Sequence, residues 1–283
     1  MPYENVYRNL QGHLRLPFAD LPLLLDVHEV HISTQDRPAV ENMYQFLDSA
    51  MSLAGRLRSH LCSYEEDTWV NVPFHALFLD TQAVVLFLRQ FMEDVGFVVR
   101  VVLPHGVRRQ MPAGFTDLAK KIRAAGPGHD ERLAVVLPQT DPFRRFLVTE
   151  EPWLQGVKDM RDDLCHRTAY GRLRTATFPS RTDLIRAGGS TAPFVSEADL
   201  RTYLCGLFQR WLALACLASE FVRRRIREDH PEPQLPVADG FIVREGEIDF
   251  TVSSAEPLFP LGTTVRTVSA VSLEGLEYFL ANP

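Results

Sequence analysis

The sequence predicts a mainly α fold of the α+β class, an antiparallel helical bundle with a small β-sheet. Three observations support this prediction. Apolar residues recur at three- and four-residue spacing over several long segments, which is the period of an amphipathic helix. Segments near both ends of the chain alternate apolar with polar residues and are rich in β-branched side chains, which is typical of strands. The 283 residues are 46% hydrophobic and 23% charged, enough apolar material for one large core.

Three parts are expected along the chain. Residues 1–37 are an N-terminal strand segment, in which residues 23–32 carry the alternating pattern. Residues 38–230 form the helical bundle. Residues 231–283 are a C-terminal appendage with a β-hairpin, a further strand and a short helix. We expect the N- and C-terminal segments to share one small sheet against the bundle.

The helices of the bundle are located by apolar spacing and by residues that start or stop a helix. They are expected at residues 38–63, 73–95, 115–125, 151–166 and 196–230. The run 133–137 is β-branched and fits either a strand or a buried helix turn. Asp80 interrupts the wide apolar arc of the second helix. We interpret it as a surface or capping residue, with a polar contact at a site as the alternative.

Composition and charge argue against several classes of protein. A formal net charge of −6 argues against a protein that coats nucleic acid without sequence preference. The N-terminus lacks a secretory pattern, and no apolar run reaches the roughly 18 residues of a membrane span. We therefore expect a cytoplasmic protein without membrane association. We expect neither a metal nor another cofactor, because no zinc spacing, P-loop or dinucleotide fingerprint is visible.

One short motif carries candidate chemistry, an arginine and a histidine five positions apart. A guanidinium group binds a phosphate with fixed donors, and an imidazole moves protons near neutral pH. Together they supply the two functions that RNA cleavage without a metal requires at the least, proton transfer and stabilisation of the charge on phosphate. The spacing occurs at Arg8–His13, Arg100–His105, Arg161–His166 and Arg225–His230. Only Arg161–His166 lies at the end of one predicted helix of the bundle and before the next, and this placement distinguishes it from the other three pairs.

Arg161, Asp162 and His166 resemble the arginine, polar residue and histidine signature of HEPN domains (higher eukaryotes and prokaryotes nucleotide-binding), here in its five-position spacing. The resemblance implies an antiparallel helical bundle and a homodimer or pseudo-dimer whose paired motifs form one metal-independent endoribonuclease site. It also implies that Arg161 contacts phosphate, that His166 is the acid/base, and that Asp162 orients the site. Such domains often act in toxin–antitoxin, defence or RNA-processing systems, so an antitoxin or regulatory protein is an expected partner.

The arginines that follow the motif are candidates for RNA contact. Arg167, Arg172 and Arg174 open a polar segment, and residues 164–182 contain no acidic side chain. Their alternative role is to pair with carboxylates of neighbouring helices or to remain hydrated. Two functions stay open on this basis. One is an endoribonuclease, and the other is a non-catalytic helical module that binds RNA, a nucleotide or a protein.

Overall fold

The computed structural model describes residues 18, 40, 43, 49–50, 52–60, 74–166, 200–229, 237–244, 247–254, 264–269 and 278. Within these residues the fold is mainly α, as predicted. The named helices are α4 (Phe74–Val101), α5 (His105–Arg108), α6 (Phe115–Ala124), α7 (Glu131–Val136), α8 (Pro142–Thr149), α9 (Glu151–His166) and α12 (Leu200–Asp229). Residues 52–60 are also helical.

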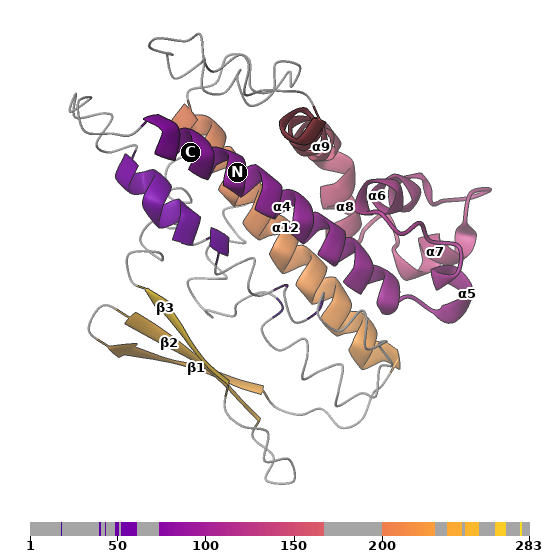
Figure 1. Cartoon of the computed structure of the whole chain (residues 1–283). Helices are drawn as coiled ribbons and strands as arrows, with labels where there is room; N and C mark the ends of the chain where they lie inside the picture. The colour runs from indigo at the N-terminus through magenta and orange to yellow at the C-terminus, as the bar shows by residue number, and fades with distance from the viewer. Residues whose placement is uncertain are drawn as a thin grey trace.

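Two long helices form the centre of the structure. The 28 residues of α4 and the 30 residues of α12 lie side by side (Figure 1). Helices α6 and α9 pack on α4, and α8 packs on α12. Helix α4 runs past its predicted end at residue 95. It continues because Val98 and Val99 extend the buried stripe, and it ends shortly before Pro104, which disfavours helical geometry in the residue before it.

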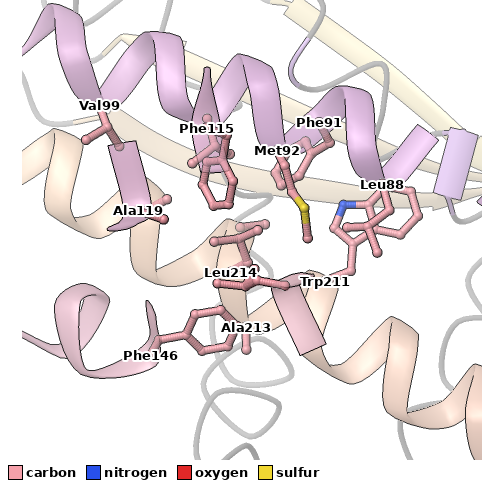
Figure 2. Packing of buried hydrophobic residues seen from close by; sticks show 14 of the residues in the cluster. Leu88, Phe91, Met92, Val99, Phe115, Ala119, Phe146, Trp211, Ala213 and Leu214 are labelled. Atoms are coloured by element: carbon pink, nitrogen blue, oxygen red, sulfur yellow. The ribbon is translucent and has the colours of Figure 1, made fainter. Parts of the chain in front are cut away.

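The core is built from apolar side chains of several helices. Figure 2 shows part of this cluster, drawn from α4, α6, α8 and α12: Leu88, Phe91, Met92, Val99, Phe115, Ala119, Phe146, Trp211, Ala213 and Leu214. The ring centroids of Phe91 and Trp211 are 6.0 Å apart, and both side chains are buried. Since burying one large apolar side chain contributes roughly 1.5–3 kcal/mol, this cluster is the main source of stability.

The central part of α12 is more apolar than the sequence analysis allowed. Leu204–Ile226 is long and apolar enough, by length and composition, to cross a membrane, with a mean hydropathy of 1.2. In the fold, 67% of this window is buried inside the protein. Its apolar residues therefore face other helices, which is how a core helix differs from a lipid-facing one. The expectation that no apolar run reaches the length of a membrane span is therefore wrong for α12, and the burial of this helix fits a core position.

Three short helices were ambiguous or missed in the sequence, and α5 is one that was missed. Residues 131–136 are the helix α7, so the helical alternative for the β-branched run is correct over most of its length. Helix α8 was not predicted, although its start carries a clear signal. The Asp141 carboxylate accepts hydrogen bonds from the backbone N–H groups of Phe143 at 2.9 Å and Arg144 at 3.2 Å, and Pro142 occupies the first helical position.

Helix α8 is tied to α12 by a carboxylate at each end. Asp141 at the N-terminal end forms an ion pair with Arg224, and Glu150 at the C-terminal end accepts a hydrogen bond from Nε of Arg210 at 2.7 Å. Both carboxylates are buried, whereas the two arginines reach solvent. Removing one partner of such a pair leaves a buried charge without compensation, so these contacts specify how α8 lies on α12.

A buried arginine joins three helices. Arg144 of α8 is 3% exposed, and its guanidinium donates to backbone carbonyl oxygens at the C-terminal ends of α6 and α7. The acceptors are Leu137 at 2.7 Å, Arg123 at 3.3 Å and Ala125. These carbonyls have no partner within their own helices, and the partial negative charge of a helix end favours a cation there. The Arg144 side chain therefore caps the C-terminal ends of α6 and α7, and it attaches α8 to both.

The C-terminal region contains a three-stranded antiparallel sheet in the order β1-β2-β3. The strands are β1 (Val237–Arg244), β2 (Glu247–Ser254) and β3 (Thr264–Ser269). The register pairs Arg244 with Glu247 beside the connection and Val237 with Ser254 at the far end. Residues 23–32 lie outside the described residues, so a strand contributed by the N-terminal segment stays a prediction.

We predict that Arg144→Met lowers the free energy of unfolding by roughly 3–5 kcal/mol. Methionine keeps much of the apolar stem, but it leaves the carbonyl oxygens at two helix ends buried without donors, each at a cost of about 1–3 kcal/mol. Urea unfolding followed by circular dichroism measures the change.

The matched control is Arg145→Met, because Arg145 is the next residue of α8 and is exposed. This substitution should change the free energy of unfolding by less than about 0.5 kcal/mol. Equal effects of the two substitutions would contradict the role given to Arg144.

Candidate functional site

Arg161 and Asp162 lie near the C-terminal end of α9, on a helix that the core holds in place. Helix α9 packs against α4 and α8. Its buried residues are Trp153, Leu154, Val157 and Met160. The side chains of Arg161 and Asp162 are 40% and 42% exposed. The motif therefore begins where an anchored helix meets solvent.

An ion pair joins the first two residues of the motif. Nη1 of Arg161 donates a hydrogen bond to Oδ1 of Asp162 at 2.9 Å. An ion pair this exposed contributes about 0–1 kcal/mol, because water screens it. A phosphate group can therefore compete with Asp162 for the guanidinium. Until it does, Asp162 restricts the orientation of Arg161.

The helical register decides which motif positions share a face of α9. The helix includes residue 166, so its backbone turns regularly through the whole motif. An α-helix turns by roughly 100° per residue, so positions 161 and 166 are separated by roughly 140° around the axis. Positions 162 and 166 are four apart and lie on the same face. Within one chain, the arginine and histidine positions of the motif therefore do not share a face.

Several predicted site residues cannot be placed in the fold. The side chain of His166 lies outside the described part of the structure, and so do Arg167, Arg172 and Arg174 altogether. The roles of acid/base for His166 and of RNA contact for the three arginines stay predictions. Of the predicted catalytic residues, the structure brings together Arg161 and Asp162.

A second group of polar side chains, which the sequence analysis did not single out as a site, joins residues 52–60 to α4. Arg56 donates two hydrogen bonds to Asp80, from Nε to Oδ2 at 3.1 Å and from Nη2 to Oδ1 at 2.8 Å. Nε2 of His60 lies 3.5 Å from Oδ2 of Asp80. We call these residues the Arg56–His60–Asp80 cluster. Asp80 thus makes polar contacts with a neighbouring helical segment, and that these contacts belong to a site stays a prediction.

The sequence indicates individual features of this cluster but not that its three residues meet. Arg56 and His60 are four apart in a predicted helix, which places them on one face. Asp80 stands out because it interrupts an apolar arc. Nothing local connects it with residues 24 positions earlier, since their meeting depends on how two helices pack.

Asp94 of α4 is a buried carboxyl group with a raised pKa. Burial raises the pKa from 3.8 to about 6. A hydrogen bond from Nε2 of Gln90, 3.3 Å away, opposes that rise, and the neighbouring charge of Glu93 adds to it. Glu93 has a structural task of its own, because it accepts a hydrogen bond from the backbone N–H of Phe115 at 2.8 Å, at the start of α6.

Metal and thiol chemistry have little support in the part of the chain that is described. There, no group of three or more His, Cys, Asp or Glu side chains is arranged to hold a metal ion. Burial raises the pKa of Cys216 to about 12, so this thiol stays protonated at neutral pH. A protonated thiol is a poor nucleophile.

We predict that Asp94→Asn stabilises the protein by an amount of the order of 2 kcal/mol at pH 8. Between pH 3.8 and about 6 the folded protein holds a proton that the unfolded chain releases, so wild-type stability falls as pH rises through this window. Asparagine avoids the buried charge and can still accept from Gln90. The gain should disappear below about pH 4, where the carboxyl is neutral in both states. Urea unfolding at several pH values measures it.

Asp159→Asn is the matched control. Gln155 donates to Asp159 at 2.7 Å with the same four-residue spacing, but the pair is exposed on α9. Its substitution should change stability by less than about 0.5 kcal/mol at each pH. A gain for Asp94→Asn that does not depend on pH would rule out the buried charge as its cause.

No protein-family model, no curated protein and no solved structure matches the chain. The candidate function therefore depends on the residues of the chain itself and on the short resemblance of its motif.

Proposed function

We propose that this protein is a HEPN-like, metal-independent endoribonuclease of the cytoplasm, which acts as a homodimer without a cofactor. The observation that supports this proposal is a half-exposed Arg161, ion-paired with Asp162, which begins the motif on an anchored helix of a mainly helical fold. In the proposed site, Arg161 contacts the scissile phosphate, Asp162 orients Arg161, and His166 transfers protons.

The proposed reaction uses the 2′-hydroxyl of RNA as its nucleophile. His166 accepts the hydroxyl proton while the oxygen attacks phosphorus, and the bond from phosphorus to the 5′-oxygen breaks. The leaving oxygen takes up a proton from water, and the protonated His166 returns its proton to the solvent. Arg161 stabilises the charge that accumulates on the phosphate oxygens. The products are a 2′,3′-cyclic phosphate and a free 5′-hydroxyl, and no metal takes part.

The register of α9 favours a site that two copies share. Positions 161 and 166 of one chain lie roughly 140° apart around the helix, so one copy presents them in different directions. A symmetric dimer can bring Arg161 of one copy to His166 of the other, and it does so twice because its two-fold axis relates both pairs.

The segment after the motif is proposed to guide the RNA. Arg167, Arg172 and Arg174 would contact backbone phosphates, which gives affinity without base specificity. An antitoxin or regulatory protein would act by covering this segment and the motif. Growth arrest on expression, relieved by Arg161→Ala, is the expected sign of such a system.

RNA cleavage in EDTA tests the proposal. We expect the purified protein to cleave end-labelled single-stranded RNA, and His166→Ala or Arg161→Ala to lower the rate by roughly 10²–10⁴-fold, the usual contribution of a positioned acid or base. The control is the double variant Arg100→Ala, His105→Ala, which removes a pair of the same spacing at the junction of α4 and α5. It should cleave at the wild-type rate. Cleavage that survives His166→Ala would eliminate the assigned site.

Mixing two inactive variants tests the shared site. If each site combines Arg161 from one copy with His166 from the other, a heterodimer of Arg161→Ala and His166→Ala contains one intact site. An equimolar mixture allowed to exchange subunits should then recover about a quarter of wild-type activity, since half of the dimers are mixed and each has one site. If both residues act within one chain, the mixture stays inactive.

The same register supports a second candidate function. A motif whose two positions do not share a face suits a non-catalytic helical module that binds RNA, a nucleotide or a protein through Arg161 and the arginines beyond it. In that case neither the wild-type protein nor any variant cleaves RNA. RNA retention on a filter would still weaken with Arg161→Ala and with added salt.

A further inference from the structure

The Arg56–His60–Asp80 cluster has the layout of a binding site and not only of a surface ion pair. Its carboxylate is the innermost group, because the side chain of Asp80 is 14% exposed. The side chain of His60 is 23% exposed and that of Arg56 is 56% exposed. Both nitrogen-bearing groups thus lie outward from one acidic anchor. An anion arriving from solvent would meet them before it meets the carboxylate.

The contact with Asp80 leaves one edge of the Arg56 guanidinium for another ligand. The carboxylate binds the Nε–Nη2 edge with both oxygens, at 3.1 and 2.8 Å. A guanidinium is planar and has a second edge, formed by Nη1 and Nη2, which also matches two oxygens of a phosphate. Among the described residues no group is bonded to Nη1 of Arg56. Asp80 therefore holds the planar group rigidly without occupying its outer edge.

His60 can serve as the second donor to the same ligand. Its Nε2 lies 3.5 Å from Oδ2 of Asp80, which orients the ring. Nδ1 lies on the other side of the ring, and it donates to a ligand when the ring is protonated. Arg56 and His60 are one helical turn apart on a common face, so a single phosphate group can reach both.

The cluster is not needed to hold the two helices together. Leu53, Ala54 and Leu57 of the segment 52–60 are buried in the common core, where they anchor this segment. A partly exposed ion pair adds little to such packing, because water screens it. Stabilisation of the fold therefore does not explain why Arg56, His60 and Asp80 are arranged together.

The local charge suits an anion. Residues 52–60 include Arg56, Arg58 and His60 and no carboxylate, although the whole chain is acidic. Arg58 lies over the ring of Tyr278, 5.8 Å from its centroid, which keeps its charge near the same segment. Within the cluster, Asp80 of α4 is the acidic group, and it contacts both Arg56 and His60.

We propose that Arg56, His60 and Asp80 form a site that binds a phosphate group, with Arg56 and His60 as donors and Asp80 as the residue that positions both. The ligand class is a phosphate ester, supplied by a free nucleotide or by an RNA backbone. This proposal does not rest on the ribonuclease function, since its residues lie on other helices than Arg161 and His166.

Titration with inorganic phosphate tests the site. The full-length protein is followed by the ring-nitrogen NMR signals of its histidines, at constant ionic strength, and the His60 signal is identified by its loss in His60→Asn. We expect a saturable shift of this signal, and an apparent affinity that falls about tenfold or more in Arg56→Gln. Arg123→Gln is the control, because Arg123 also forms an ion pair, with Glu151 at 2.7 Å, but without a histidine. It should leave the titration unchanged.

Asp80→Asn distinguishes a site whose donors are positioned by Asp80 from a surface that attracts anions only through its positive charge. If Asp80 positions the donors, its loss weakens phosphate binding. If the cluster attracts anions only through its charge, removal of a negative group strengthens binding, and the proposal fails. The absence of any saturable shift of the His60 signal would also overturn it. Circular dichroism shows whether each variant remains folded.

Two further ligands identify the source of the phosphate. Adenosine monophosphate binding more tightly than inorganic phosphate indicates a nucleotide site, and a short single-stranded RNA binding most tightly indicates an RNA backbone site. Both outcomes support the proposal. Arg161→Ala should leave the His60 titration unchanged, so failure of one proposal does not decide the other.

Discussion

The buried guanidinium of Arg144 is the interaction on which the arrangement of the helices depends. It donates to carbonyl oxygens at the ends of α6 and α7 from within α8, and its side chain is buried. Helix ends are tolerated in a core only when their last carbonyls find donors. Arg144 meets this requirement for two helices at once. The short helices α6 and α8 can therefore pack against each other, with α6 on α4 and α8 on α12 (Figure 1).

The ion pairs of α8 also help to set the position of α9, on which the motif lies. Asp141 and Glu150 attach the two ends of α8 to α12, and α9 follows α8 directly in the chain. Helix α9 also packs against α4 through its buried face. The position of Arg161 is thus set by contacts far from the motif, and a rigid support of this kind is what a phosphate-binding arginine needs.

The many arginines of this chain have structural as well as surface roles. Arg144 closes helix ends, while Arg210 and Arg224 pair with buried carboxylates. Arginine suits these tasks because its planar group offers several fixed donors and never loses its charge. The abundance of arginine is therefore weak evidence for RNA binding. Individual arginines such as Arg56 and Arg161 are candidates because they are exposed beside a carboxylate that orients them.

Local patterns were enough to locate most helices and the register of the motif. Helices α6, α9 and α12 begin and end within a few residues of their predicted bounds, because apolar spacing and capping residues act over one or two turns. Helix α8 was missed because eight residues give too short an apolar pattern, although Asp141 and Pro142 signalled its start. The pairing of Asp80 with Arg56 and of Asp141 with Arg224 spans 24 and 83 residues. Such pairs follow from the angles at which helices pack and from the path of the chain between them, so they emerge only when the whole core is assembled.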